Sequence, residues 1–388
     1  MRVAVITRYF PTSQEPWAGH SAYQTLRILS KQCELKVFYP ESRYPPLLTP
    51  ASRADRQIDF SHQVEGVQVQ YLPYPALPAI SRPLNGLSAS RSILSSVRAY
   101  RPDIILNYIV YPDGDAALRV ARALRIPLVV TAIGSDLNVI PDPICGWLTR
   151  RVLRNADHTI TVSGDLLKTA RRLGAPVERS SAILNGCDTS IFHPADRMVA
   201  RSFLGVPADA EAVVYVGRLD MAKGLGELVA AVAQLSKQRP RLCVWIVGDG
   251  PARPQLSVAV AEHRMEDRIK FVPACSTDKV AAWMAASDLI TLPSYREGCP
   301  NVVVEALAAG RPVVATDVGG IPELMDNSSG RLIPARDSGA LADALDQVLS
   351  RPWDAAEIAG RHSRSWSDVS GEVAEILSES LKQGRSTC

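Results

Sequence analysis

The sequence repeats one pattern twice: short, continuously apolar runs alternate with longer amphipathic stretches such as 116–125 and 226–238. The apolar runs are rich in Val and Ile, which is typical of strands buried on both faces of a parallel sheet. We predict strands at 2–7, 34–40, 103–110, 127–133, 158–163 and 181–186, and in a second series at 212–217, 242–248, 269–273, 289–293, 312–316 and 331–334. This alternation favours an α/β fold.

The two series of strands predict two domains. A chain of 388 residues is long for a single core, since a domain usually holds about 100–200 residues. We expect two Rossmann-like, doubly wound parallel-sheet domains facing each other across a cleft. The N-terminal domain is expected at 1–190 and the C-terminal domain at 191–365, with a terminal helix at 366–388 that could cross back to the first domain. The linker is expected near 188–211.

Composition is that of an ordinary globular protein. Hydrophobic residues make up 46% and charged residues 21% of the sequence, so a sizeable core can be buried. No apolar run reaches the ~20 residues of a membrane-spanning helix. The N-terminus, MRVAVITRYF, has the pattern of a first strand and not of a signal peptide. Seven scattered cysteines without a CxxC pair favour free thiols in a reducing cytoplasm over disulfides or zinc.

Charge and proline are unevenly distributed. Residues 1–190 hold 22 Lys and Arg against 15 Asp and Glu, a net +7, whereas the remainder holds 21 against 25, a net −4. A basic first half could favour an anionic acceptor or a membrane surface, and solvated side chains explain the imbalance equally well. The proline-rich segments 39–50 and 72–83 are expected to be loops.

In open parallel sheets, ligands bind beyond the carboxyl ends of the strands, so the residues there are the first candidates for a site. The run LITLP is followed by SYREGCPNVVVEALAAG. Pro300 suits the first turn of a helix, and Gly310 suits its end. Glu297 therefore precedes the helix, and Glu305 lies in its second turn.

This helix start is a candidate anion site. Its unsatisfied backbone N–H groups and its dipole attract phosphate. The donors are those of Gly298, Cys299, Asn301 and Val302. A nucleotide diphosphate-sugar would fit, because the flanking carboxylates can accept hydrogen bonds from a hexose and a ribose. A glycosidase acid–nucleophile pair or two solvated glutamates would also account for the spacing.

Two cations follow another strand. Arg218 and Lys223 lie in the loop after Gly217, before the next helix. Cations at this spacing can straddle a diphosphate and neutralise a leaving group, although solvated basic loops are common in α/β proteins. The chain has no P-loop pattern, GxxxxGK[ST]. The turn with Gly248 and Gly250, after a third strand, allows a ligand to approach closely.

Together these motifs resemble a known family. The segments GRLDMAKG, VGDGP, SYREGCPNVVVEALAAGRPVVATDVGGIPEL and NGCDTSIFHP look like those of the retaining nucleotide-sugar glycosyltransferases of family 4 (glycosyl transferases group 1), which have the GT-B fold. The resemblance covers most of the second half and extends thinly into the first. It implies transfer of a sugar from a UDP or GDP sugar to an acceptor hydroxyl, without cofactor or metal.

The resemblance also assigns roles to individual residues. Arg218 and Lys223 would hold the diphosphate, and Glu297 would bind the donor sugar, so that these three are the expected catalytic residues. Glu305 would bind the ribose hydroxyls. The other residues expected to bind the nucleotide sugar are Gly19, Gly217, Gly248, Gly250, Gly298, Cys299, Pro300, Asn301 and Val302.

The match in the first half is partial. One glycine, Gly19, represents the glycine-rich loop that family members carry after the first strand, and His20 beside it is a candidate contact to sugar or acceptor. Ile133 stands where many relatives have a histidine that contacts the donor sugar. Asp136 remains as a polar group for donor or acceptor, or as a helix cap. We interpret Asp113-Gly114-Asp115 as a helix N-cap and not as a metal site.

The resemblance implies a hexosyltransferase of cell-surface polysaccharide, glycolipid or glycoconjugate biosynthesis. The acceptor would be a glycan or a lipid-linked molecule, and no nucleic acid is expected. Such an enzyme would be cytoplasmic or peripheral to the inner face of the membrane, where arginines of 119–125 and 150–154 could face either an anionic bilayer or solvent. A nucleotide-sugar epimerase and a non-catalytic nucleotide-sugar-binding protein stay open. A dinucleotide oxidoreductase would need GxGxxG where the chain reads TRYFPTS.

Overall fold

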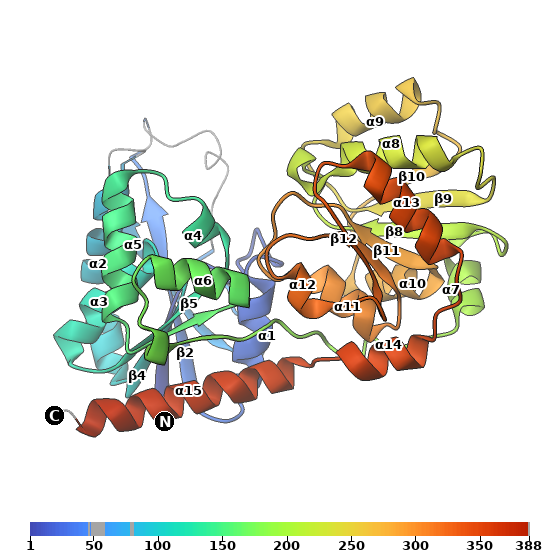
Figure 1. Ribbon diagram of the computed structural model, residues 1–388. Coiled ribbons are helices and arrows are strands. Elements are labelled where there is room, and N and C mark those ends of the chain that lie inside the picture. Colours follow the sequence, from blue (N-terminus) through green and yellow to red (C-terminus); the bar gives the residue numbers. More distant parts are fainter. Residues whose placement is uncertain (46, 48–58, 78–80, 387–388) are drawn as a thin grey trace. The chain divides into compact units, whose positions relative to one another are not determined.

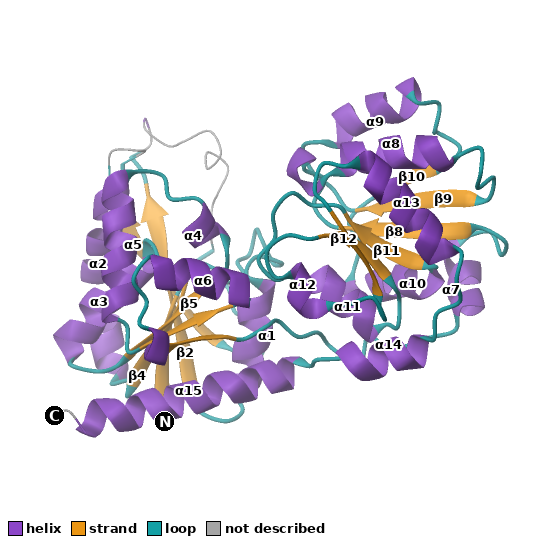
Figure 2. Ribbon diagram, viewed as in Figure 1, coloured by secondary structure: helices purple, strands orange, loops and turns teal. Residues whose placement is uncertain are grey.

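The computed structural model describes residues 1–45, 47, 59–77 and 81–386 (Figure 1). The chain divides into two compact units, Met1–Leu184 with Trp366–Cys388, and Asn185–Ser365. Each unit has a parallel sheet with helices around it, as Figure 2 shows. In the part of the chain described here, no helix combines the length and the apolar character needed to cross a bilayer.

The first unit holds a seven-stranded sheet in the order β3-β2-β1-β4-β5-β6-β7, with every neighbouring pair parallel. Its strands are β1 (Arg2–Ile6), β2 (Glu34–Arg43), β3 (Gln68–Pro75), β4 (Ile104–Tyr108), β5 (Leu128–Ala132), β6 (His158–Thr161) and β7 (Ser180–Ala182). Its helices are α1 (His20–Leu29), η3 (Arg82–Leu84), α2 (Asn85–Tyr100), α3 (Asp113–Leu124), α4 (Ser135–Asn138), α5 (Pro143–Asn155), α6 (Gly164–Arg172), η4 (Val177–Arg179) and α15 (Trp366–Ser386).

The second unit holds a six-stranded parallel sheet in the order β10-β9-β8-β11-β12-β13. Its strands are β8 (Glu211–Val216), β9 (Leu242–Val247), β10 (Ile269–Val272), β11 (Leu289–Leu292), β12 (Val313–Thr316) and β13 (Gly330–Ile333). Its helices are α7 (Arg197–Leu204), η5 (Met221–Lys223), α8 (Leu225–Leu235), α9 (Arg253–Glu262), α10 (Thr277–Ala286), α11 (Asn301–Ala308), α12 (Ile321–Leu324), α13 (Ser338–Leu349) and α14 (Ala355–His362). The predicted α/β class with two parallel sheets is confirmed.

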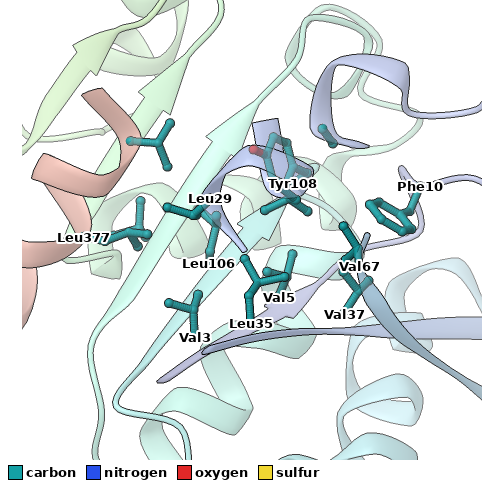
Figure 3. Packing of buried hydrophobic residues seen from close by; sticks show 14 of the residues in the cluster. Val3, Val5, Phe10, Leu29, Leu35, Val37, Val67, Leu106, Tyr108 and Leu377 are labelled. Atoms are coloured by element: carbon teal, nitrogen blue, oxygen red, sulfur yellow. The ribbon is translucent and has the colours of Figure 1, made fainter. Parts of the chain in front are cut away.

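The core of the first unit shows why its strands read as continuous apolar runs. Side chains alternate between the two faces of a strand, and both faces of β1 are covered. Val3 and Val5 lie in a buried cluster with side chains of α1 and α15, as Figure 3 shows, while Ala4 and Ile6 are equally buried outside that cluster. No polar alternation is therefore left in the sequence of this strand.

The last helix belongs to the first unit. One face of α15 contributes Trp366, Val369, Val373 and Leu377 to the buried cluster that contains residues of β1 and α1. Leu377 is labelled in Figure 3. These residues of α15 recur at intervals of three and four, which places them on one side of a helix. The chain end thus completes the core of the unit in which the chain begins.

Strand β3 was missed, because its sequence QVQYLPYP carries two prolines. It lies at the edge of the sheet, paired only with β2 among the described strands, and an edge strand tolerates a residue without an N–H donor. The expectation of loops at 39–50 and 72–83 is accordingly wrong for 39–43 and 72–75, which are strand, and for 82–83, which belong to η3. Residues 46, 48–50 and 78–80 of these segments lie outside the described residues.

The expected linker at 188–211 contains a helix instead of a continuous loop. Asp196 caps α7 and accepts hydrogen bonds from the backbone N–H groups of Met198 and Val199. Arg201 of this helix forms an ion pair with Asp288 of the second unit, with 2.7 Å between Nη2 and Oδ2. The prolines of the segment flank α7 and do not exclude it.

We predict that Leu377→Ala destabilises the first unit by about 2–5 kcal/mol, because truncating a fully buried leucine removes contacts and leaves a cavity. Urea denaturation followed by circular dichroism measures the effect. Glu375→Ala, an exposed position on the same helix, is the matched control and should change the free energy of unfolding by less than about 0.5 kcal/mol. Equal effects of the two changes would contradict this packing of α15.

Candidate active site

The strand order of the second unit reverses at β8. From β8 the chain proceeds outward through β9 and β10, and then returns to the other side of β8 to form β11, β12 and β13. Ligands of open parallel sheets bind at such a point, beyond the carboxyl ends of the two central strands. The loops that begin there are 217–224 after β8 and 293–300 after β11.

These two loops touch backbone to backbone. Gly224 has a φ of +66°, and a Cβ atom built on it would lie 1.9 Å from the carbonyl oxygen of Pro293. The N–H of Tyr295 donates to the carbonyl of Ala222 at 2.9 Å. A side chain at position 224 would force the loops apart, so glycine is required there by space as well as by backbone conformation.

The contact between the loops brings Lys223 and Glu297 together. Lys223 Nζ lies 2.6 Å from Glu297 Oε1, and the two side chains keep 29% and 11% of their surface exposed. An ammonium group has three N–H donors, so two remain for another partner. The contact joins two of the three residues that the resemblance gives as catalytic, although they lie 74 positions apart in the sequence.

Arg218 lies in the same loop as Lys223. Its side chain is exposed and makes no hydrogen bond or ion pair with any described residue. The hydroxyl of Tyr215 donates a hydrogen bond of 2.9 Å to the backbone carbonyl of Arg218. This bond fixes the backbone from which the guanidinium extends. The loop after β8 thus presents one anchored cation and one cation without a protein partner.

Helix α11 begins directly after Glu297. Pro300 is its N-cap, one position before the first helical turn in which we expected it. Four backbone N–H groups at this start donate to no other described residue: those of Gly298, Cys299, Asn301 and Val302. They form the set of free donors that an anion at a helix N-terminus requires.

Asn185 holds this helix start in place, and sequence reasoning assigned it no role. Its Nδ2 group donates to the carbonyl of Cys299 at 2.9 Å and to Oδ1 of Asn301 at 2.8 Å. Its backbone N–H donates to the buried Sγ of Cys299 at 3.3 Å. The available signal was the segment NGCDTSIFHP, which contributed to the family resemblance but gave no hint of what the asparagine contacts.

Glu305 points its carboxylate at no protein donor. The residue lies in the second turn of α11, partly accessible, and its carboxylate forms no hydrogen bond or ion pair within the described chain. Burial raises the pKa of this carboxyl from 4.5 to about 7, because the protein around it solvates the charged form poorly. A carboxylate left in this state is suited to accept hydrogen bonds from a ligand.

The glycines expected near the nucleotide lie where loops meet. A Cβ on Gly248 would come within 2.0 Å of the carbonyl oxygen of Gly217, and one on Gly250 within 2.3 Å of that of Leu219. Gly217 and Gly248 also have φ values of +157° and +139°. These three glycines are explained by packing of the loops after β8 and β9, and their contact with a nucleotide stays a prediction.

The candidates of the first unit follow β1. Gly19 has a φ of +63°, and a Cβ there would lie 2.3 Å from the backbone of Tyr9, so the loop can approach the end of β1 only with glycine. His20 begins α1, and its ring packs edge-on against Trp366 with 6.3 Å between centroids. Burial lowers the pKa of His20, which favours its neutral form.

Asp136 is engaged with the backbone of its own unit. One carboxylate oxygen accepts the N–H groups of Ile133 and Gly134 at 3.1 and 3.0 Å, and the other accepts that of Val110 at 2.9 Å. Burial raises the pKa of Asp136, while these hydrogen bonds oppose the rise. Asp136 therefore links the segments that follow β4 and β5 through hydrogen bonds. A contact with substrate stays a prediction.

The carboxylates of the segment 113–115 have arginine partners. Asp113, the first residue of α3 and not its cap, accepts the N–H and the Nε of Arg8 at 2.6 and 3.0 Å. Asp115 pairs with Arg119 and Arg151 at 2.8 and 3.2 Å. Among the residues that the structure describes, no group of three or more His, Cys, Asp or Glu side chains could hold a metal ion.

Comparisons with known proteins identify relatives of this chain. The profile of the family described as Glycosyltransferase Family 4 matches residues 18–191, and that of Glycosyl transferases group 1 matches 210–351. TuaC of Bacillus subtilis (strain 168), named as a glycosyltransferase of teichuronic acid biosynthesis, is 30% identical over 98% of this chain and 94% of its own length. A D-inositol 3-phosphate glycosyltransferase of Streptomyces bingchenggensis is 28% identical over 82% of this chain and 76% of its own length.

Solved structures share the fold. The sucrose-phosphate synthase of Thermosynechococcus elongatus is 20% identical, with a TM-score of 0.77 over 99% of this chain and all of that one. HepE of Anabaena, solved in complex with UDP, is also 20% identical, with a TM-score of 0.75 over 98% of this chain and all of that one. The chain therefore belongs to the GT-B glycosyltransferases of family 4, group 1. It is a nucleotide-sugar glycosyltransferase, as the motifs predicted.

We predict that Glu305→Gln stabilises the ligand-free second unit at pH 8 by about 1–3 kcal/mol. A carboxyl whose pKa is higher in the folded state than in the unfolded state lowers stability as the pH rises from 4.5 to about 7, and glutamine removes this loss. At pH 4 wild type and variant should be equally stable. Urea denaturation at both pH values measures the difference, with the exposed Glu262→Gln as control. A Glu305→Gln variant no more stable than wild type at pH 8 would contradict the prediction.

We predict that Asn185→Ala and Asn185→Asp each lower kcat/KM for the donor about 10–100-fold, because both remove the Nδ2 donors that orient the start of α11. Donor kinetics at saturating acceptor measure the loss. The surface change Asn327→Ala, in the same unit, is the control. Normal kinetics in Asn185→Asp would show that the amide does not position this loop.

Proposed function

We propose that the chain transfers a hexose from a UDP-sugar to an acceptor hydroxyl, with retention of configuration at the anomeric carbon. Family membership supports retention. The complexes of HepE with UDP and with UDP-glucose support a UDP-hexose donor over GDP for this fold. The relation to TuaC supports an acceptor that belongs to a cell-surface polysaccharide or another glycoconjugate.

One observation carries the proposal: a paired lysine and glutamate lie beside four free amide donors at the point where the strand order reverses. A diphosphate between Arg218, Lys223 and the start of α11 would receive two cations and several N–H donors. Charge-assisted hydrogen bonds of this kind are about twice as strong as neutral ones. Glu305 would accept hydrogen bonds from the ribose hydroxyls, which supply the donors that its carboxylate lacks in the protein.

Glu297 has a free oxygen for the sugar. Oε1 is held by Lys223, so Oε2 remains to accept a hydrogen bond from a hexose hydroxyl. The same contact fixes the orientation of the carboxylate, which lies at the end of the loop that leads into α11. The lysine therefore acts on both substrate parts, on the diphosphate directly and on the sugar through Glu297.

In the reaction we propose, the bond between the anomeric carbon and the β-phosphate oxygen breaks first, and the electron pair stays on that oxygen. Negative charge grows on the diphosphate as the bond breaks, and Arg218, Lys223 and the helix start stabilise it. The acceptor oxygen attacks the same face of the sugar and passes its proton to the departing phosphate oxygen. The protein positions the reactants and stabilises the leaving group, and no side chain has to act as nucleophile.

We predict that Lys223→Ala and Arg218→Ala each lower kcat about 10²–10³-fold, the usual effect of removing one group that stabilises developing charge. Release of nucleoside diphosphate in the presence of acceptor measures turnover. Lys237→Ala, an exposed lysine of the same unit, should leave kcat unchanged. Near-normal turnover in both site variants, with the fold intact, would refute the assignment of these two cations.

Thermal stabilisation by UDP, GDP and ADP tests the choice of donor. A ligand that binds only the folded state raises apparent stability by RT ln(1 + L/Kd), where L is the free ligand concentration, so at equal concentration the tighter ligand stabilises more. We expect UDP to stabilise most and Lys223→Ala to abolish most of that stabilisation. A preference for GDP would leave the reaction class in place and refute the UDP-hexose donor.

A further inference from the structure

An apolar groove of about 830 Å³ opens in the first unit, apart from the residues to which the proposed reaction has been assigned. It lies between the ends of β2 and β3 and the start of α2, and its walls include Pro73, Pro75, Leu84 and Leu87. Leu77 and Leu84 of the walls are 40% and 57% exposed. Pockets of about 300–1,000 Å³ are the size of small-molecule binding sites.

The groove lies on the edge of the sheet at which this fold binds ligands. All strands of the first unit are parallel, so the carboxyl ends of β2 and β3 lie at the same edge as those of β1 and β5. The loops with Gly19 and Asp136 begin at that edge. A molecule held in the groove would extend along the edge that this unit presents to substrates.

The charged side chains among the described residues that line the groove are both positive. They are those of Arg43 and Arg91, and no described lining residue is acidic. The side chain of Arg91 is exposed and makes no hydrogen bond or ion pair with the described residues, while the guanidinium of Arg43 lies 4.7 Å from the ring centre of Phe60. From 66 to 102 the sequence contains four arginines and no aspartate or glutamate.

We propose that this groove binds the hydrocarbon chain of an amphiphilic acceptor, whose phosphate lies against Arg91. Aliphatic walls select a chain without polar atoms, and the unpaired guanidinium at the rim selects an anion next to that chain. A bare bilayer surface would match a convex apolar face, whereas a groove encloses a single chain. This assignment names the acceptor class of the proposed transferase and rests on that function.

The probe for the test is dodecyl phosphate below its micelle concentration, compared with inorganic phosphate and with dodecyl glucoside, by isothermal titration calorimetry on the full chain. We expect dodecyl phosphate to bind at least about tenfold more tightly than either of the other two, because only it offers both chain and anion. Equal binding of inorganic phosphate would overturn the role of the groove. Equal binding of dodecyl glucoside would overturn the role of Arg91.

Two matched pairs of variants on α2 locate the binding. Ser92→Trp fills the groove and should weaken dodecyl phosphate binding at least tenfold. Ser95→Trp, at an exposed position of the same helix that does not line the groove, should leave binding unchanged. Arg91→Gln should reduce binding to the level of dodecyl glucoside, and the exposed Arg98→Gln on the same helix should leave it unchanged. Equal effects within either pair would overturn the proposal and indicate adsorption to the surface.

Donor binding separates failure of this proposal from failure of the proposed function. UDP stabilisation depends on the second unit and should be the same in wild type and in Ser92→Trp. Loss of dodecyl phosphate binding with UDP stabilisation intact would confirm the groove as a separate site. If the wild-type protein binds UDP but not dodecyl phosphate, only the groove proposal is refuted. If it binds dodecyl phosphate but not UDP, the UDP-sugar donor is refuted, and the groove remains a site for an anionic amphiphile.

Discussion

The site of the second unit depends on the direct contact between the loops that follow β8 and β11. Gly224 lets the first loop approach the carbonyl of Pro293, and this approach brings Lys223 within 2.6 Å of Glu297. Without it the lysine would extend into solvent, where an ion pair contributes ~0–1 kcal/mol and fixes no geometry. Gly224 therefore determines where Lys223 and Glu297 lie, although it has no functional side chain of its own.

The sequence predicted most of the fold, because hydrophobic periodicity was strong. All twelve predicted strands are present, since both faces of each sheet are covered and a continuous apolar run is the direct consequence. Strand β3 was missed, since Pro73 and Pro75 are rare in strands and only the position at the sheet edge makes them tolerable. Helix α7 was missed because its flanking prolines resemble those of a linker.

For the proposed site, the sequence indicated candidate residues for the chemistry but not the residues that position them. Lys223, Glu297 and Glu305 stand out because they follow the carboxyl ends of predicted strands, where ligands of parallel sheets bind. Asn185 does not, because its contact with Cys299 joins positions 114 apart and leaves no periodic or local pattern. The apolar groove was equally invisible, since its walls come from β2, β3 and α2 and are read one by one as loop or helix residues.

Net charge gives a misleading picture of where the anion would bind. Residues 191–388 carry a net −4, yet the proposed diphosphate site lies there, whereas the basic first half carries +7. At physiological ionic strength, charges more than about 8–10 Å away are largely screened. A phosphate in the second unit would therefore respond mainly to Arg218, Lys223 and the N–H groups at the start of α11. The surplus of arginines in the first unit needs a separate explanation, and an anionic group on the acceptor supplies one without requiring that the donor bind there.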